Sequence, residues 1–301
     1  MRPIGENTRR ADSILQPADL ASIDTQLRLP DVNALISRQV APARTGDHPG
    51  TEVIVYKRLT REGAAKIFNF AGADNVPLVD QYTAPYTQVV RSIVIGFQIT
   101  QQERRAAAMS GLDPVAGKTD TCKHYAAVKE NSIFWSGSAS HNIEGLLAYT
   151  GAQTYSVPNG VSVHPDWARK TTAEVLEDWR TAWGKVHLQD NYRATMAILN
   201  TKTSANLYRR LADADSTTIR KFMDEQGWFP AGILTTEAIP VGTMVILQNT
   251  RDVIEYALPM DLSPYDPFKV NGMTEEVDFE ERYGGPILHR PLGVCIVTGI
   301  A

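Results

Sequence analysis

The pattern of apolar and polar positions is most informative between residues 91 and 149. It predicts a strand at Thr87–Thr100, followed by a short helix. Thr100 and Glu103 have the spacing of a capping box, and the alanines after them favour a helix until Gly111 ends it. We find no convincing set of catalytic residues in this stretch, which favours a building block over an enzyme.

A second, longer helix is predicted to begin near Asp120, or a few residues earlier, and to end at Gly137. Its length of about 15 to 20 residues corresponds to roughly 22 to 30 Å. It would be a long rod on which other layers can pack. The apolar positions that share one face at helical spacing are Cys122, Tyr125, Ala126 and Ile133.

A long excursion precedes these elements. Branched residues predict a strand at Thr51–Leu59, after the turn at residues 46–50. About 27 residues, 60–86, then separate it from the strand at Thr87. Compact domains rarely carry such a loop unless it has a function. Phe68 and Phe70 need a surface that buries them, and a protruding loop must find that surface on a neighbour.

The later part of the chain predicts an α/β lobe. A helix is expected from Thr172 to about Gln189, because Val175, Trp179, Trp183 and Val186 form one stripe. Short helices at Ser204–Leu211 and Thr217–Gln226 then alternate with strands, and β-structure returns from about Pro259. By contrast, residues 1 to about 45 are polar and proline-rich, and we expect this arm to order against another surface.

Composition and charge narrow the classes of protein. The hydrophobic content of 43% and the charged content of 21% are ordinary for a soluble fold. The net charge of −4 argues against a generally basic DNA-coating protein, although a local basic face remains open. Cys122 and Cys295 lie in apolar segments and are interpreted as buried free thiols. Neither a secretory signal nor a membrane span is expected.

Candidate chemical motifs have simpler structural interpretations. A-G-K-T at 116–119 resembles the end of a phosphate loop but lacks its first glycine, so we interpret it as a turn between two helices. The six histidines are scattered without metal-ligand spacing, and S-G-S-A-S at 136–140 lacks the nucleophile elbow. The acidic run at 275–282 predicts a strand with a solvated acidic face, because Val277 and Phe279 alternate within it.

The order of elements resembles that of the major capsid proteins of tailed bacteriophages, whose fold is shared with encapsulin nanocompartment shells. The blocks that carry the resemblance are V-R-S…Q-E-R-R-A-A…G-L-D-P…A-A-V-K-E-N, F-W-S-G…N-I-E-G-L-L and E-R-Y-G-G-P-I-L-H-R-P-L. The resemblance implies an α+β fold with an N-terminal arm (1–49) and an extended β-loop (50–88). It also implies a peripheral domain with a long spine helix (89–190), an axial α/β domain (191–258) and a return to the peripheral domain (259–301).

By resemblance, the protein is expected to be a structural major capsid protein, not an enzyme, without cofactor or metal. It would self-assemble through hexamers and pentamers into an icosahedral shell enclosing phage double-stranded DNA. We expect a virion capsid assembled in the host cytoplasm, with portal, scaffolding and decoration proteins as further partners and no membrane. No long helical, charge-rich prefix is recognisable, so a separate scaffold or none is expected.

The extended loop is expected to lie over a neighbouring subunit. The candidate subunit-contact residues are Lys57, Arg58, Arg61, Phe68 and Phe70. Some relatives form Lys–Asn crosslinks from this loop, but nothing marks Lys57 or Lys66 as reactive, and we assign none. The arginines at positions 2, 9 and 10 suggest a basic inner lining.

Two alternatives stay open. An encapsulin-like nanocompartment shell protein holding an enzyme cargo would share the same fold. A soluble enzyme with an α/β lobe would instead be a monomer or a small oligomer with a pocket of converging polar groups.

Overall fold

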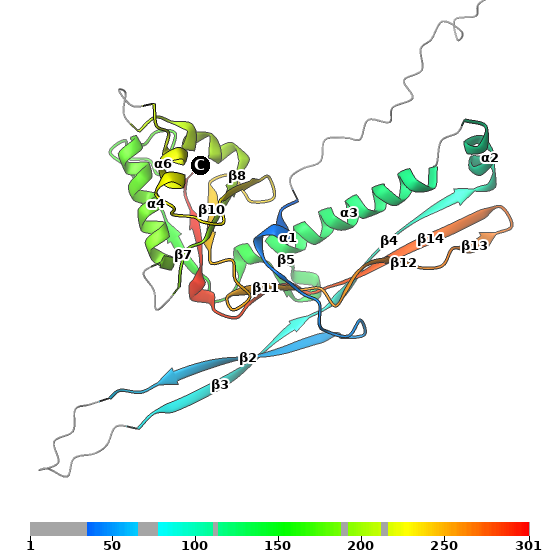
Figure 1. Cartoon of the computed structure of the whole chain (residues 1–301), viewed down its shortest axis with the longest axis horizontal. Helices are drawn as coiled ribbons and strands as arrows, with labels where there is room; N and C mark the ends of the chain where they lie inside the picture. Colours follow the sequence, from blue (N-terminus) through cyan, green and yellow to red (C-terminus); the bar gives the residue numbers. More distant parts are fainter. Residues whose placement is uncertain (1–34, 66–77, 111–113, 188–191, 212–215, 301) are drawn as a thin grey trace, which may run out of the picture. The chain divides into compact units, whose positions relative to one another are not determined.

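A long helix packed on a long antiparallel strand pair organises one part of the molecule (Figure 1). The computed structural model describes residues 35–65, 78–110, 114–187, 192–211 and 216–300. Strand β14 (Thr274–Tyr283) pairs along its whole length with β4 (Arg91–Thr100), from Thr274 opposite Thr100 to Tyr283 opposite Arg91. The other edge of β14 pairs with β12 (Met260–Pro264) and β13 (Phe268–Asn271).

The predicted capping box is confirmed at the start of helix α2 (Gln101–Ser110). The Thr100 amide donates to Glu103 Oε2 at 2.8 Å, and the Glu103 amide donates to Thr100 Oγ1 at 3.2 Å. Each side chain therefore satisfies a backbone N–H that the first turn of a helix leaves without a partner.

The predicted long helix is confirmed as α3 (Pro114–Ser136), but it starts earlier and is longer, with 23 residues. Proline suits its first position, where no intrahelical N–H bond is required. A-G-K-T therefore lies inside the helix, and our interpretation of it as a turn between helices is wrong. Lys118 of this motif donates to Gln98 O at 2.8 Å and Glu103 Oε1 at 3.1 Å, which ties α3 to β4 and α2.

The α/β lobe is built on a five-stranded sheet in the order β7-β16-β10-β8-β9. Successive residues of the central strands pack into two different core clusters, so both faces of the sheet are covered. Strands buried on both faces carry nearly continuous apolar runs. The bounds of the strands are β7 Gln153–Ser156, β8 Met196–Asn200, β9 Ile233–Thr236, β10 Thr243–Leu247 and β16 Val294–Thr298.

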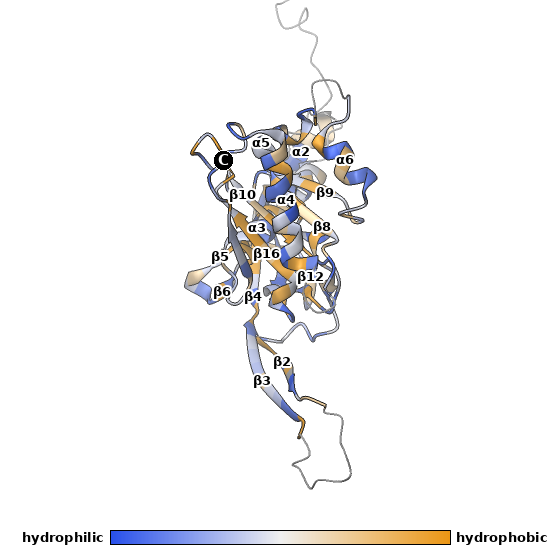
Figure 2. Cartoon of the chain, turned by 90° about the vertical axis from the view of Figure 1, so that its left-hand side faces the viewer, coloured by the Kyte–Doolittle hydropathy of each residue, from blue (hydrophilic) through white to orange (hydrophobic). Residues whose placement is uncertain are grey.

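Helices cover one face of this sheet. Helix α4 (Thr172–His187) confirms the predicted stripe, since Val175, Trp179 and Val186 are fully buried and Trp183 packs beside them. The helix predicted at Thr217–Gln226 is observed as α6 (Ile219–Glu225). The helix predicted at Ser204–Leu211 instead starts three residues earlier, as α5 (Thr201–Ser204) and a 3-10 turn that ends at Tyr208. In Figure 2 the strands β8, β10 and β16 have the orange colour of hydrophobic residues, whereas much of α6 has the blue colour of hydrophilic residues.

The sheets do not follow the expected sequence ranges exactly. β7 and β16 belong to the five-stranded sheet although they lie outside residues 191–258. Conversely, β11 (Ile254–Ala257) lies within that range but pairs with β1 (Ala43–Arg44) and β15 (Gly285–Leu288). The division into arm, extended loop, peripheral and axial domains remains a proposal.

A tight corner follows α3 and joins the helix to the core. The two short strands β5 (Gly137–Ser138) and β6 (Ile143–Glu144) pair there. A Cβ atom on Gly145 would lie 2.3 Å from the backbone nitrogen of Gly137, whose φ is +72°. Both positions therefore require glycine, the first for space and the second for its left-handed backbone.

Three further predictions can be compared with the structure. The strand predicted at Thr87–Thr100 is two strands, because β3 (Asp80–Val89) pairs with β2 (Val53–Glu62) whereas β4 pairs with β14.

The acidic run is a strand as predicted, but its acidic face is not wholly solvated. Glu281 is buried, since it shares a face with Phe279 and Tyr283. The two cysteines are buried free thiols, as predicted.

A short segment before the hairpin completes the described elements. Helix α1 (Ser37–Val40) lies against α3, where the Ser37 amide donates to Asn131 Oδ1 at 3.3 Å. Val40 of this helix is fully buried in the same core cluster as Phe134 and Trp135 at the end of α3.

Candidate subunit-interface hairpin

Strands β2 and β3 form a two-stranded antiparallel hairpin within the expected extended loop. Their ladder runs from Val53 opposite Val89 to Glu62 opposite Asp80, ten residues on each strand. Within the described part of the chain, no other strand pairs with either edge. An isolated two-stranded ribbon is marginally stable by itself, so its anchoring is central to its geometry.

The root of the hairpin is anchored by a small apolar cluster. Ile54 and Tyr56 of β2 and Val90 after β3 are buried with Ala257 of β11 and Ile287 of β15. These residues share the face of the ribbon that turns toward the molecule. They hold only its base, because burial ends at Tyr56 on β2 and begins again at Gln88 on β3.

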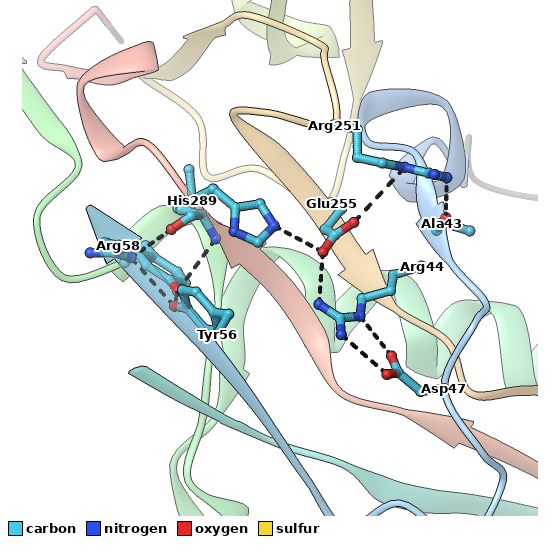
Figure 3. A network of polar contacts seen from close by, with 10 residues as sticks. Ala43, Arg44, Asp47, Tyr56, Arg58, Arg251, Glu255 and His289 are labelled. Atoms are coloured by element: carbon cyan, nitrogen blue, oxygen red, sulfur yellow. Dashed lines mark hydrogen bonds and ion pairs between the residues drawn. The ribbon is translucent and has the colours of Figure 1, made fainter. Parts of the chain in front are cut away.

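Arg58 supports the same face of the root. Its Nη2 donates to the backbone oxygen of Leu288 at 2.5 Å (Figure 3). Its guanidinium lies 4.0 Å from the ring centre of Tyr86. A cation over an aromatic ring is attracted by the negative face of the ring. The hydroxyls of Tyr56 and Tyr149 lie 2.9 Å apart and join β2 to the corner after α3. The hairpin thus leaves the molecule in a defined direction.

A buried carboxylate, Glu255, organises the polar contacts behind the root (Figure 3). Its Oε1 lies 2.8 Å from His289 Nε2 and accepts from Arg44 Nη1 at 3.3 Å. Burial opposes its ionisation, but the contacts with His289 and Arg44 outweigh burial and lower the pKa of Glu255. Arg44 also binds Asp47, with Nε 2.7 Å from Oδ2. The segment before the hairpin is therefore tied to β11 and, through Glu255, to His289 directly after β15.

The opposite face of the hairpin is exposed. Val53, Val55 and Leu59 are 48%, 59% and 50% exposed, and Lys57 and Arg61 alternate with them on the same face. Side chains two residues apart on a strand point the same way. This free face therefore combines three apolar side chains with two cations.

The predicted contact residues are distributed unevenly. Lys57 and Arg61 lie on the free face, whereas Arg58 lies on the opposite face and binds its own chain. Phe68 and Phe70 lie outside the described residues, as do Lys66 and the arginines at positions 2, 9 and 10.

Sequence reasoning did not identify Tyr56, Tyr149, Glu255 and His289 as root residues. The contacts that join them are remote in sequence: His289 and Glu255 are 34 positions apart, and Tyr56 and Tyr149 are 93 positions apart. The only available signal was the H-R-P-L tail block that carries His289.

Two serines and a histidine form a small polar cluster in the turn between β5 and β6. Ser138 and Ser140 both place their hydroxyls near His141 Nδ1, at 2.8 and 2.9 Å, in a short exposed turn.

The described residues include no group of three His, Cys, Asp or Glu suited to a metal ion. Among those residues, no helix has the length and apolar character needed to cross a membrane.

Solved structures with a similar fold come from capsids and related particles. The chain resembles the capsid of Myoviridae phage XM1 with a TM-score of 0.79 and 11% identity, covering 96% of this chain and 100% of that one. The capsid of a native GTA particle gives 0.69 and 14%, covering 99% of both chains. A virus-like particle from Pyrococcus furiosus gives 0.58 and 15%, covering 86% and 90%. The fold is that of shell-forming capsid proteins, as the sequence resemblance predicted.

Residues 63–300 match the family described as major capsid protein. The chain belongs to this family, and it is a structural protein of the virion capsid. No curated protein matches it.

Proposed function

We propose that copies of this chain assemble through hexamers and pentamers into an icosahedral shell around phage double-stranded DNA. The observation that carries this proposal is a firmly anchored hairpin whose free face is apolar and cationic within a major capsid protein fold. Closed shells arise when one subunit repeats the same contacts around symmetry axes. On this proposal the protein has no enzymatic activity of its own.

The free face of the hairpin is proposed to pack on a neighbouring subunit. Val53, Val55 and Leu59 would lose exposed apolar area there, which is favourable in water. Lys57 and Arg61 would give the contact its orientation through opposite charges on the neighbour. Phe68 and Phe70 are proposed to belong to the same contact. Arg58 would act indirectly, by holding the hairpin in the direction that reaches the neighbour.

Packaged DNA is proposed to lie against the inner face, lined by the arginines at positions 2, 9 and 10. Positive side chains near phosphates release condensed counterions, which favours contact. Assembly in the host cytoplasm and partnership with portal, scaffolding and decoration proteins belong to the same proposal.

Electron microscopy of the purified full-length protein tests the proposal. Closed particles of uniform diameter, with five-fold and six-fold vertices after reconstruction, are the expected result. A monomer or small oligomer at all concentrations and salt conditions tried, in the presence of co-expressed phage proteins as well, would contradict it.

An encapsulin-like shell holding an enzyme cargo is the second candidate. The similarity to the virus-like particle from Pyrococcus furiosus favours it, although its TM-score is below that of the phage capsid. Analysis of particles from the native source separates the two candidates. Packaged double-stranded DNA supports the phage shell, and a single abundant protein inside DNA-free particles supports the compartment.

A further inference from the structure

Two carboxylates are buried side by side where α3 meets β14. The side chains of Glu130 and Glu281 are 2% and 1% exposed. Arg38 of α1 reaches both, with Nη2 2.9 Å from Glu130 Oε2 and 3.3 Å from Glu281 Oε1. The same nitrogen lies 2.9 Å from Oδ1 of Asp261, an exposed residue of β12. One guanidinium thus joins four elements of the fold.

The charges at this junction do not balance. Three carboxylates surround one guanidinium, and two of them are removed from water. Two adjacent buried carboxylates cannot both ionise without a large cost, so one of them retains a proton. The remaining titratable groups facing the pair are two tyrosines, which are neutral near pH 7, and a lysine on the rim of the adjoining cavity: Tyr256, Tyr283 and Lys123.

Solvent can exchange protons with the pair. A cavity of about 410 Å³ adjoins it, lined in part by Arg38, Lys123, Asp261 and Glu281. A space of this size with charged groups in its wall can hold several water molecules. Burial, and then the charge of Glu130, raise the pKa of Glu281 to about 8.

We propose that Glu130 and Glu281 share one proton and, with Arg38, form a pH-dependent latch that holds α1 against α3 and β14. While the proton is present, the junction carries one buried negative charge, which Arg38 neutralises. As the pH rises through the alkaline range the proton leaves, and a second buried charge repels the first. The latch then weakens, and α1 is released from α3.

The sign of the effect follows from proton binding. Between the ordinary carboxyl pKa of about 4.5 and the raised value, the folded protein holds one proton more than the unfolded chain. The contribution of this junction to stability is therefore fully present below about pH 4.5 and is lost as the pH rises to about 8. This direction is opposite to that of an ordinary salt-bridged carboxylate.

Thermal unfolding and hydrogen exchange of the full-length protein test the latch. From about pH 6 to about pH 9 we expect the melting temperature to fall by about 4 °C and exchange at Ser37–Val40 to accelerate. Glu281→Gln keeps a neutral hydrogen-bonding side chain and should flatten both profiles. Glu276→Gln is the matched control, because it makes the same substitution on the opposite face of β14, where Glu276 contacts Gln98, and it should leave the profile unchanged. Parallel profiles for the wild type and Glu281→Gln would overturn the proposal.

A spectroscopic measurement on the unmodified protein keeps the test decisive if a variant does not fold. Infrared difference spectra should show one protonated carboxyl group at neutral pH that disappears in the alkaline range. Absence of that band at neutral pH would show that both carboxylates are ionised and would also overturn the latch.

Discussion

At the scale of single residues, Arg58 makes two different kinds of contact at the root of the hairpin. It combines a hydrogen bond to Leu288 O with a position over the ring of Tyr86. Arg58→Ala removes both and should lower the free energy of unfolding by about 1 to 3 kcal/mol. Arg58→Lys keeps the charge but not the planar guanidinium, so it should lose less. Urea unfolding of the three proteins measures the difference, and equal stability of all three would contradict this role.

Glu255 should give the opposite pH dependence to Glu281. The pKa of Glu255 is lowered in the folded protein, because its contacts with His289 and Arg44 outweigh the burial that opposes ionisation. Its contribution to stability is therefore present above the ordinary carboxyl pKa and is lost as the pH falls through the lowered value. Glu255→Gln should destabilise the protein at pH 7, by roughly 1 to 3 kcal/mol, and much less at about pH 3. Chemical denaturation at the two pH values checks this, and a pH-independent difference would contradict it.

At the scale of elements, two glycines around α3 should respond differently to alanine. A Cβ on Gly145 would meet the backbone at 2.3 Å, whereas a Cβ on Gly117 within α3 has nothing within 4 Å. Gly145→Ala should abolish or severely impair folding, because the obstructing atoms are main chain. Gly117→Ala should stabilise the protein by about 0.5 to 1 kcal/mol through its higher helix propensity. Soluble yield and guanidinium unfolding measure both effects, and a stable Gly145→Ala variant would show that the corner can move.

The hairpin is the element whose two faces have separate roles. Leu59→Asp places a charge on the free face and should raise the concentration needed for assembly at least about 10-fold, with an unchanged melting temperature of the free subunit. Tyr82→Asp is the matched control, because Tyr82 is 53% exposed on the other face of the ribbon and pairs with Thr60, not with Arg58. Light scattering and electron microscopy measure assembly. Equal assembly of both variants would exclude the free face from the subunit contact.

At the scale of the whole molecule, assembly and DNA packaging should be separable. Deleting residues 1–10 removes three arginines, and we expect shells that form but hold less DNA. Replacing the same arginines by glutamine is the control for loss of charge without loss of length. Nucleic acid content per particle, from the absorbance ratio of purified shells, measures the effect. Unchanged packaging in both variants would remove the basic lining from the proposed function.

Local sequence patterns predicted helices well where the signal lies within a few turns of one helix. The capping box at Thr100 and Glu103 and the stripe on α4 depend on residues three to eleven positions apart, so they can be read without a fold. The same reasoning failed at Glu281, which has the composition of a solvated residue but lies on the buried face of β14. Its partner Glu130 and the bridging Arg38 are remote in sequence, and no local pattern joins them.

The sequence by itself therefore determined most of the elements, their order, the family resemblance and the existence of a long excursion, because each depends on composition and short-range spacing. Only the tertiary structure decided that β7 and β16 complete the five-stranded sheet and that the hairpin has one anchored and one free face. Only it brought Arg38, Glu130 and Glu281 together. Burial and charge balance depend on which distant residues meet, and that is a property of the folded chain.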